Sequence, residues 1–150
     1  MKVKKVYKGS ELDILIPEYL SDMELPLVDA LISAGFPSPA DDYSEERLDL
    51  NKKLVLNPAS TFYVRVNGYS MSEDGIHHGD LLIVDKSLTP KDNSILVCFI
   101  DGEFTLKRLV ATANGNFLMP SNPQFDPIKI NPESDFRLWG VVTYSIKKHY

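Results

Sequence analysis

A serine that follows a glycine at an expected turn is the first residue of this 150-residue chain that could do chemistry. Ser70 stands in the segment Gly68-Tyr69-Ser70-Met71, just after an apolar run that ends at Val66, and Gly68 permits a sharp change of chain direction. A hydroxyl on such a turn can act as a nucleophile in acyl transfer if a base accepts its proton. The pattern also fits an ordinary turn serine, and the Gly-x-Ser-x-Gly motif is absent because position 72 is serine.

The three histidines do not offer that base in a recognisable context. His77 and His78 lie between Gly75 and Gly79, which is typical of a polar loop. Neither these two nor His149 has the sequence context of a Ser-His-Asp hydrolase. A lysine is the other residue type that could serve.

Lys107 is the candidate lysine because of its place in an apolar segment. In the run from Glu103 to Leu109, period-two alternation puts Lys107 on the same face as Thr105 and Leu109. At its reference pKa, roughly one lysine in 2,500 is neutral at pH 7, so an effective lysine base must be buried. The alternative is an ordinary surface lysine beside Arg108 in a solvated strand.

Short apolar runs rich in β-branched and aromatic residues, separated by turn formers, fill the chain from Thr61 onward. This pattern predicts strands, and Asp101-Gly102 between two of the runs predicts a hairpin. Because no ten-residue helical pattern interrupts them, we expect a mainly β fold, a curled antiparallel sheet or small barrel-like sandwich. The predicted strands cover residues 61–66, 81–84, 95–100, 103–109, 117–119, 128–130 and 138–146.

The first sixty residues predict an extended arm without strands. Prolines at positions 17, 26, 37, 39 and 58 block long regular elements. One short helix is compatible with the apolar spacing between Pro26 and Gly35. We therefore expect an N-terminal regulatory arm over residues 1–60 and one domain over residues 61–150. No role is assigned to the basic residues 1–10.

Composition narrows the function classes. With 16 basic and 21 acidic residues the net charge is -5, and the segment from Glu11 to Asp49 holds eleven acids against Arg47 alone. A net acidic chain without a basic stripe is a poor candidate for direct DNA binding. No apolar run is long enough for a membrane span or a signal peptide, so a cytoplasmic protein is expected. Cys98 is expected to be a buried thiol, and neither a metal nor another cofactor is expected.

Taken together, the motifs resemble the LexA family of self-cleaving serine–lysine peptidases, and within it the UmuD-type branch. Ser70 and Lys107 are 37 residues apart, and Ala34 and Ser70 are 36 apart, which agrees with that branch. The resemblance covers about residues 27 to 146. The matching segments are Ala34-Gly35-Phe36-Pro37-Ser38-Pro39-Ala40-Asp41, Gly68-Tyr69-Ser70-Met71, Gly75-Ile76, residues 79–85, residues 101–107 and Trp139-Gly140-Val141-Val142.

The resemblance implies a function and a set of site residues. Ser70 matches the family nucleophile, Lys107 matches its general base, and Ala34-Gly35 matches the dipeptide that members cut in their own chain. It further implies a homodimer, cleavage promoted by a RecA filament on single-stranded DNA, and a shortened product that joins a UmuC-type Y-family translesion DNA polymerase. No membrane and no sequence-specific DNA binding is implied.

Three alternatives remain open at this point. A LexA-like repressor would need a DNA-binding module, and the arm is too short and too acidic to provide one. A signal-peptidase-like enzyme would need a membrane anchor. A catalytically silent β module would only bind partners, and the presence of Ser70, Lys107 and Ala34-Gly35 together argues against it.

Overall fold

The computed structural model describes residues 3–17, 24–26 and 47–150. Two compact units divide the chain: Met1–Tyr19 with Asn57–Tyr150, and Leu20–Leu56. In the smaller unit, β3 (Glu24–Pro26) pairs with β4 (Arg47–Asp49), which leads into helix α1 (Leu50–Leu54). No helix in the described part of the chain has the length and apolar character needed to cross a membrane.

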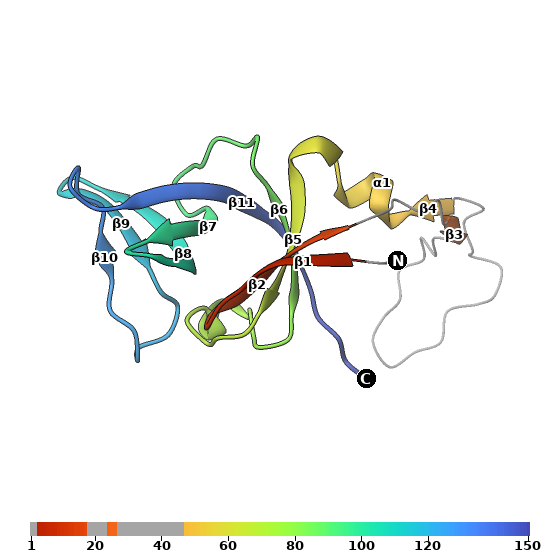
Figure 1. Cartoon of the computed structure of the whole chain (residues 1–150), viewed down its shortest axis with the longest axis horizontal. Coiled ribbons are helices and arrows are strands. Elements are labelled where there is room, and N and C mark those ends of the chain that lie inside the picture. Colours follow the sequence, from red (N-terminus) through yellow and green to blue (C-terminus); the bar gives the residue numbers. More distant parts are fainter. Residues whose placement is uncertain (1–2, 18–23, 27–46) are drawn as a thin grey trace, which may run out of the picture. The chain divides into compact units, whose positions relative to one another are not determined.

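The described strands of the larger unit form one curled, nine-stranded antiparallel sheet (Figure 1). Its two edges are β1 and β10. The strands follow the order β1 (Val3–Lys8), β2 (Leu12–Pro17), β5 (Thr61–Val66), β6 (Leu81–Asp85), β11 (Phe136–Ile146), β7 (Ile95–Ile100), β8 (Glu103–Thr112), β9 (Gly115–Met119) and β10 (Ile128–Lys129).

The structure confirms the mainly β fold class and the seven strands predicted from Thr61 onward, with small shifts at their ends. The predicted hairpin joins β7 to β8, with Ile100 opposite Glu103. Both turn residues have positive φ, 49° for Asp101 and 89° for Gly102. Asp-Gly suits this turn because aspartate tolerates, and glycine favours, the left-handed region.

The prediction of an arm without strands is wrong for residues 3–17, and the short strands β3 and β4 also contradict it. β1 and β2 form a hairpin, and β2 pairs with β5 along Leu12–Leu15. Two features hide this hairpin in the sequence. The register of β1 shifts between Lys5 and Tyr7, and four consecutive residues of β2, Leu12 to Leu15, are all buried. Neither strand therefore shows the period-two alternation on which the prediction rested. The helix predicted from Pro26 to Gly35 lies outside the described residues.

Two apolar clusters form the core of the sheet. The first packs β2, β5, β6, β7 and β8 together with Met71 and Ile76 from the loop after β5. The second packs residues of β7, β9 and β11. The long strand β11 pairs with β7 through its first half and with β6 through its second half, and its register shifts twice, at 138–140 and 142–144. Such bulges increase the local twist and bend of a strand.

A buried carboxylate fixes the end of β6. Asp85 accepts hydrogen bonds from Asn57 Nδ2 (2.7 Å), Ser60 Oγ (2.9 Å), and the amide and hydroxyl of Ser87 (2.8 and 2.6 Å). Burial opposes its charge, but the hydrogen bonds outweigh burial and lower the pKa of Asp85 from 3.8 to about 2. Because the folded-state pKa is depressed, Asp85 stabilises the fold above about pH 4, and this contribution is lost as pH falls through about 2.

Asp85→Asn should therefore lower the free energy of unfolding at pH 7 by about 2 kcal/mol, the equivalent of nearly two pKa units. Urea unfolding at pH 7, 4 and 2.5 measures the effect, and the difference from wild type should shrink toward the lowest pH. The exposed Asp126 provides a matched control, since Asp126→Asn removes the same charge without a buried network. If Asp85→Asn lowers the free energy of unfolding by the same amount at all three pH values, the ionised carboxylate does not have the stabilising role given to it.

Candidate active site

The loop after β5 holds Ser70 in place. Met71 is buried at 1% exposure and anchors the loop in the first core cluster, and the 3-10 helix η3 (Ser72–Asp74) follows. From the segment after β9, the amide of Ser121 donates to the Ser70 carbonyl (2.7 Å), and Asn122 Nδ2 donates to the Tyr69 carbonyl (2.8 Å). Ser70 is therefore a buried serine, not an exposed turn serine. Its loop is held by the core on one side and by the segment after β9 on the other.

Lys107 lies in the middle of β8 and is 3% exposed. Its Nζ donates a hydrogen bond to Thr105 Oγ1, two residues earlier on the strand, which confirms that the two side chains share a face. The alternative of a solvated surface lysine is therefore wrong. Burial is the condition that a lysine must meet before it can act as a base near neutral pH.

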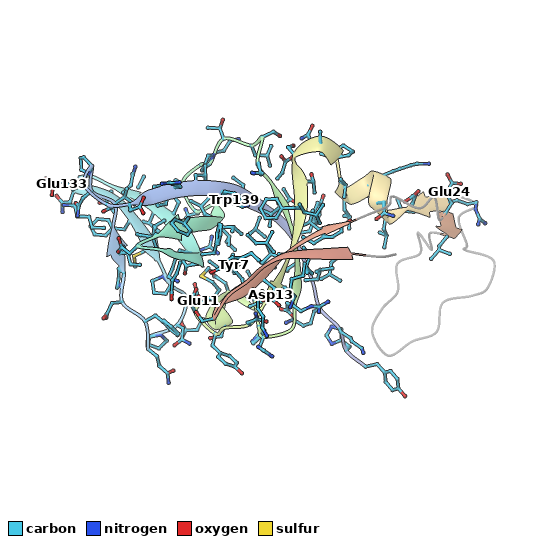
Figure 2. All side chains as sticks on the ribbon, viewed as in Figure 1. Tyr7, Glu11, Asp13, Glu24, Glu133 and Trp139 are labelled. Carbon is cyan, nitrogen blue, oxygen red and sulfur yellow. The ribbon has the colours of Figure 1, made fainter. Side chains whose placement is uncertain are left out.

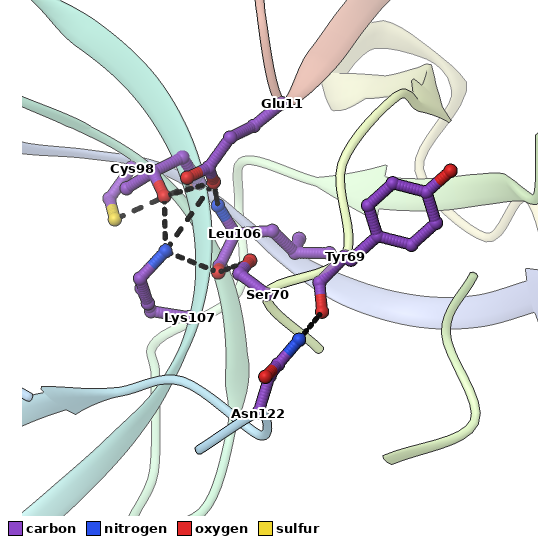
Figure 3. Close-up of polar contacts among 8 residues, drawn as sticks. Glu11, Tyr69, Ser70, Cys98, Leu106, Lys107 and Asn122 are labelled. Carbon is purple, nitrogen blue, oxygen red and sulfur yellow. Dashed lines mark hydrogen bonds and ion pairs between the residues drawn. The ribbon is translucent and has the colours of Figure 1, made fainter. Parts of the chain in front are cut away.

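Ser70 and Lys107 meet at one backbone carbonyl, as Figure 3 shows. The Ser70 hydroxyl donates to the carbonyl oxygen of Leu106 (3.2 Å), and Lys107 Nζ donates to the same oxygen (3.1 Å). Among the described residues, no hydrogen bond joins Ser70 Oγ directly to Lys107 Nζ. The fold thus brings together the two residues singled out from the sequence, with a hydroxyl beside a buried amine.

A carboxylate, that of Glu11, also reaches the site, and no sequence motif indicated it. It lies in the turn between β1 and β2, and its Oε2 is 3.4 Å from Lys107 Nζ. The same oxygen accepts a hydrogen bond from Thr105 Oγ1. The contact spans 96 positions of sequence and depends on a hairpin that the residue pattern did not predict.

Cys98, on the neighbouring strand β7, is a fully buried thiol, as expected from its apolar run. Its Sγ donates to the carbonyl of Thr105 (3.8 Å). Burial raises the pKa of Cys98 to about 12; the charge of Lys107 opposes the rise and that of Glu11 adds to it. A thiol with this pKa is neutral near pH 7, so Cys98 is not a competing nucleophile.

The histidines are exposed loop residues, in agreement with the polar-loop interpretation of the pair at 77 and 78. His77 Nδ1 contacts Lys147 Nζ (2.9 Å), and His78 Nδ1 contacts the carbonyl of Asn67 (2.7 Å). Neither side chain bonds to Ser70. The dipeptide Ala34-Gly35 lies outside the described residues.

Comparison with known proteins assigns the chain to a family. A family model described as Peptidase S24-like matches residues 26–143. The chain belongs to the S24 peptidase family. The match includes Ser70, Lys107 and Ala34-Gly35, whereas Glu11 lies before it.

Among individual S24 relatives, MucA of Salmonella typhimurium is 45% identical over 119 residues, which is 79% of this chain and 81% of MucA. SamA of Salmonella typhimurium strain LT2 is 46% identical over 123 residues, or 82% of this chain and 85% of SamA. The LexA repressor of Bordetella avium is 35% identical over 130 residues, or 87% of this chain and 60% of the repressor.

These S24 relatives confirm the resemblance drawn from the motifs: the chain is a UmuD-like protein. The curled antiparallel sheet agrees with the LexA-like fold expected for the family. Family and relatives together indicate a self-cleaving peptidase connected with the SOS response.

Proposed function

We propose that this S24 protein is a serine endopeptidase that cuts its own chain between Ala34 and Gly35, with Ser70 as the nucleophile and Lys107 as the general base. The observation that carries the proposal is the meeting of the Ser70 hydroxyl and the buried Lys107 amine at the Leu106 carbonyl. A nucleophile and a base within reach of each other in a buried site are the minimum that acyl transfer by serine needs.

The chemistry balances with these two side chains and one water. Neutral Lys107 Nζ takes the Ser70 hydroxyl proton while Oγ bonds to the Ala34 carbonyl carbon. The bond from that carbon to the Gly35 nitrogen then breaks, and Lys107 returns the proton to the leaving amine. Water, losing a proton to Lys107, attacks the resulting ester on Ser70. The ester bond then breaks, Lys107 returns the proton to Ser70 Oγ, and the acid released at Ala34 loses its remaining proton to solvent.

Backbone amides beside Ser70 are available to stabilise the oxyanion formed in each step. Among the hydrogen bonds of the described residues, none has the amide of Ser70 or Met71 as its donor. An amide of the nucleophile's own loop lies close to the carbonyl under attack, and a positioned donor of this kind is worth about 10²–10³ in rate. We assign the Ser70 N–H to this role.

The biological output that we propose is a protein–protein interaction rather than continued proteolysis. In this proposal residues 1–60 form the regulatory region that carries the cleavage site, with residues 3–17 packed as two strands on the sheet, and residues 61–150 form the peptidase and interaction domain. A RecA filament on single-stranded DNA stimulates cleavage in the cytoplasm. The shortened chain, as a homodimer, then serves as accessory subunit of a UmuC-type Y-family polymerase.

Intact mass after incubation at about pH 10 tests the peptidase directly, because an unperturbed lysine begins to lose its proton there. Wild type should yield two fragments, of residues 1–34 and 35–150. Gly35→Trp is the matched variant: the scissile bond remains but its approach to Ser70 is sterically blocked, so this protein should stay whole.

Cutting of Gly35→Trp at the wild-type rate would place the cleavage site elsewhere. If wild type stays whole at pH 10, the incubation is repeated near neutral pH with RecA, ATP and single-stranded DNA. A chain that is still uncut is not a self-cleaving peptidase but a binding module.

A further inference from the structure

The turn between β1 and β2 is fastened to the loop that carries Ser70. The amides of Asn67 and Gly68 both donate to the carbonyl of Glu11, at 2.7 and 3.0 Å. Asn67 Nδ2 reaches back to the carbonyl of Gly9 (3.2 Å) and to Asp13 Oδ1 (2.9 Å). A Cβ on Gly68 would come within 3.3 Å of Glu11 Cα, so this glycine permits the close approach. The backbone of Glu11 is therefore fixed relative to the nucleophile loop.

Further contacts seat the hairpin on the sheet. The Tyr7 ring packs edge-on against Phe104 of β8, with 4.6 Å between ring centroids, and Figure 2 shows Tyr7, Glu11 and Asp13 on this hairpin. Lys5 Nζ pairs with Asp13 at 2.6 Å across the two strands. These contacts leave the Glu11 side chain directed at β8, where it meets Thr105 and Lys107.

The polar network around Lys107 accounts for every proton of an ammonium group. An ammonium has three N–H donors, and Nζ has three acceptors: Thr105 Oγ1, the Leu106 carbonyl and Glu11 Oε2. The Thr105 hydroxyl donates its own proton to Glu11, so its oxygen is left to accept from Lys107. The Ser70 proton points to the Leu106 carbonyl instead of to the amine.

While Lys107 is held in this network as an ammonium, it cannot accept the Ser70 proton. Taking the Ser70 proton requires a neutral amine with its lone pair toward Ser70 Oγ, whereas an ion pair with Glu11 requires the ammonium. Among the described residues, no other charged group competes with this ion pair at the same face of β8. Cys98 Sγ is neutral. The side chain of Arg108 is on the other face of β8 and pairs with Asp74 at 2.8 Å.

We propose that Glu11 is a positioning residue that holds Lys107 in its protonated, resting state, so that the N-terminal hairpin sets the basal rate of self-cleavage. The inference rests on the proposed roles of Ser70 and Lys107. It gives the residues before the family match a function, because Glu11 precedes residue 26 where that match begins. Cleavage starts when the Lys107 ammonium releases its proton to solvent, and loss of the Glu11 contact makes that release easier.

The first test measures protonation and does not depend on cleavage. In Ser70→Ala protein, the 13Cε resonance of Lys107 is followed by NMR from pH 6 to 12 and assigned by its absence in Lys107→Met. Adding Glu11→Gln should move the titration midpoint to lower pH, because a neighbouring carboxylate favours the charged form of a lysine. Glu133→Gln, on a loop well removed from Glu11 in Figure 2, removes the same charge as a control and should leave the midpoint in place. An unchanged midpoint in Glu11→Gln overturns the proposal.

The second test measures self-cleavage of the full-length chain with Ser70 present. Glu11→Gln should be cut about tenfold faster than wild type at pH 7, and the difference between the two rates should shrink at high pH, where an amine has less need of help to lose its proton. Acceleration by the same factor at every pH, or a slower rate at pH 7, contradicts a role through protonation. If neither protein is cut under any condition, the peptidase assignment fails, and the NMR midpoint alone decides whether Glu11 controls Lys107.

Discussion

Lys107→Met should reduce self-cleavage by about 10²–10⁴-fold, the usual contribution of a general base, and Ser70→Ala should reduce it below detection. Methionine fills a similar volume to lysine in the buried position on β8 but has no amine to accept the Ser70 proton. Alanine at position 70 removes the atom that bonds to the scissile carbonyl. The rate of appearance of the 35–150 fragment, followed by mass spectrometry from pH 7 to 11, measures both effects.

The shape of the pH profile separates loss of the base from loss of structure. Wild-type cleavage should rise with pH as Lys107 loses its proton, whereas any residual cleavage by Lys107→Met should lack that rise. Because Lys107→Met leaves the Glu11 carboxylate without its cation, the double variant with Glu11→Gln is the stability control. A Lys107→Met protein that is folded and cut at the wild-type rate would remove Lys107 from the mechanism.

The strands after Thr61 could be predicted because the residue types at their turns, such as Asp-Gly, strongly favour turns. Asp101-Gly102 fixed both a hairpin and its register, and β-branched runs marked the strands on either side. Local context made Ser70 and Lys107 candidates, and the family motifs then favoured them over an ordinary turn serine and an ordinary surface lysine. Their meeting at the Leu106 carbonyl depends on the curl of the sheet, and no local pattern encodes it.

The hairpin of residues 3–17 escaped prediction for a physical reason. β2 lies between β1 and β5 and buries four consecutive residues, including Asp13, whose charge made the segment resemble a solvated arm. That aspartate is paired with Lys5 and hydrogen-bonded by Asn67. Glu11 was missed together with the hairpin, since a carboxylate in an acidic stretch carries no sign that it faces a lysine on another strand.

The sheet curls around the site, and in β11 this curl requires a residue without a side chain at Gly140. In the strand order, β11 stands between β6 and β7. It therefore lies midway between β5, the strand before Ser70, and β8, the strand that carries Lys107. Four strand spacings of about 4.8 Å would put β5 and β8 roughly 19 Å apart in a flat sheet. The two side chains nevertheless share one carbonyl, so the sheet must curl between them. The register shift at 138–140 is one of two bulges in the strand at the centre of this curl.

Gly140→Ala should destabilise the fold by about 3 kcal/mol, the upper part of the range for overpacking. An added Cβ would stand 2.7 Å from Val84 Cγ1 and 3.2 Å from the Asp85 carbonyl oxygen, in a core where Val84 is fully buried. Urea unfolding measures the loss, and Val84→Ala provides the matched partner because it removes the methyl group in closest contact. The double variant should be less destabilised than the sum of the single variants.

If the stability losses of Gly140→Ala and Val84→Ala simply add in the double variant, the Val84 methyl is not the group that excludes a side chain at position 140. The backbone contact with Asp85 remains in the double variant, so its stability should recover only in part. Self-cleavage measured in low urea, where each variant is fully folded, should still be slower than wild type. The reason is that a less strongly bent β11 would move Ser70 away from Lys107. A cleavage rate equal to wild type would show that the bend of the sheet tolerates the substitution.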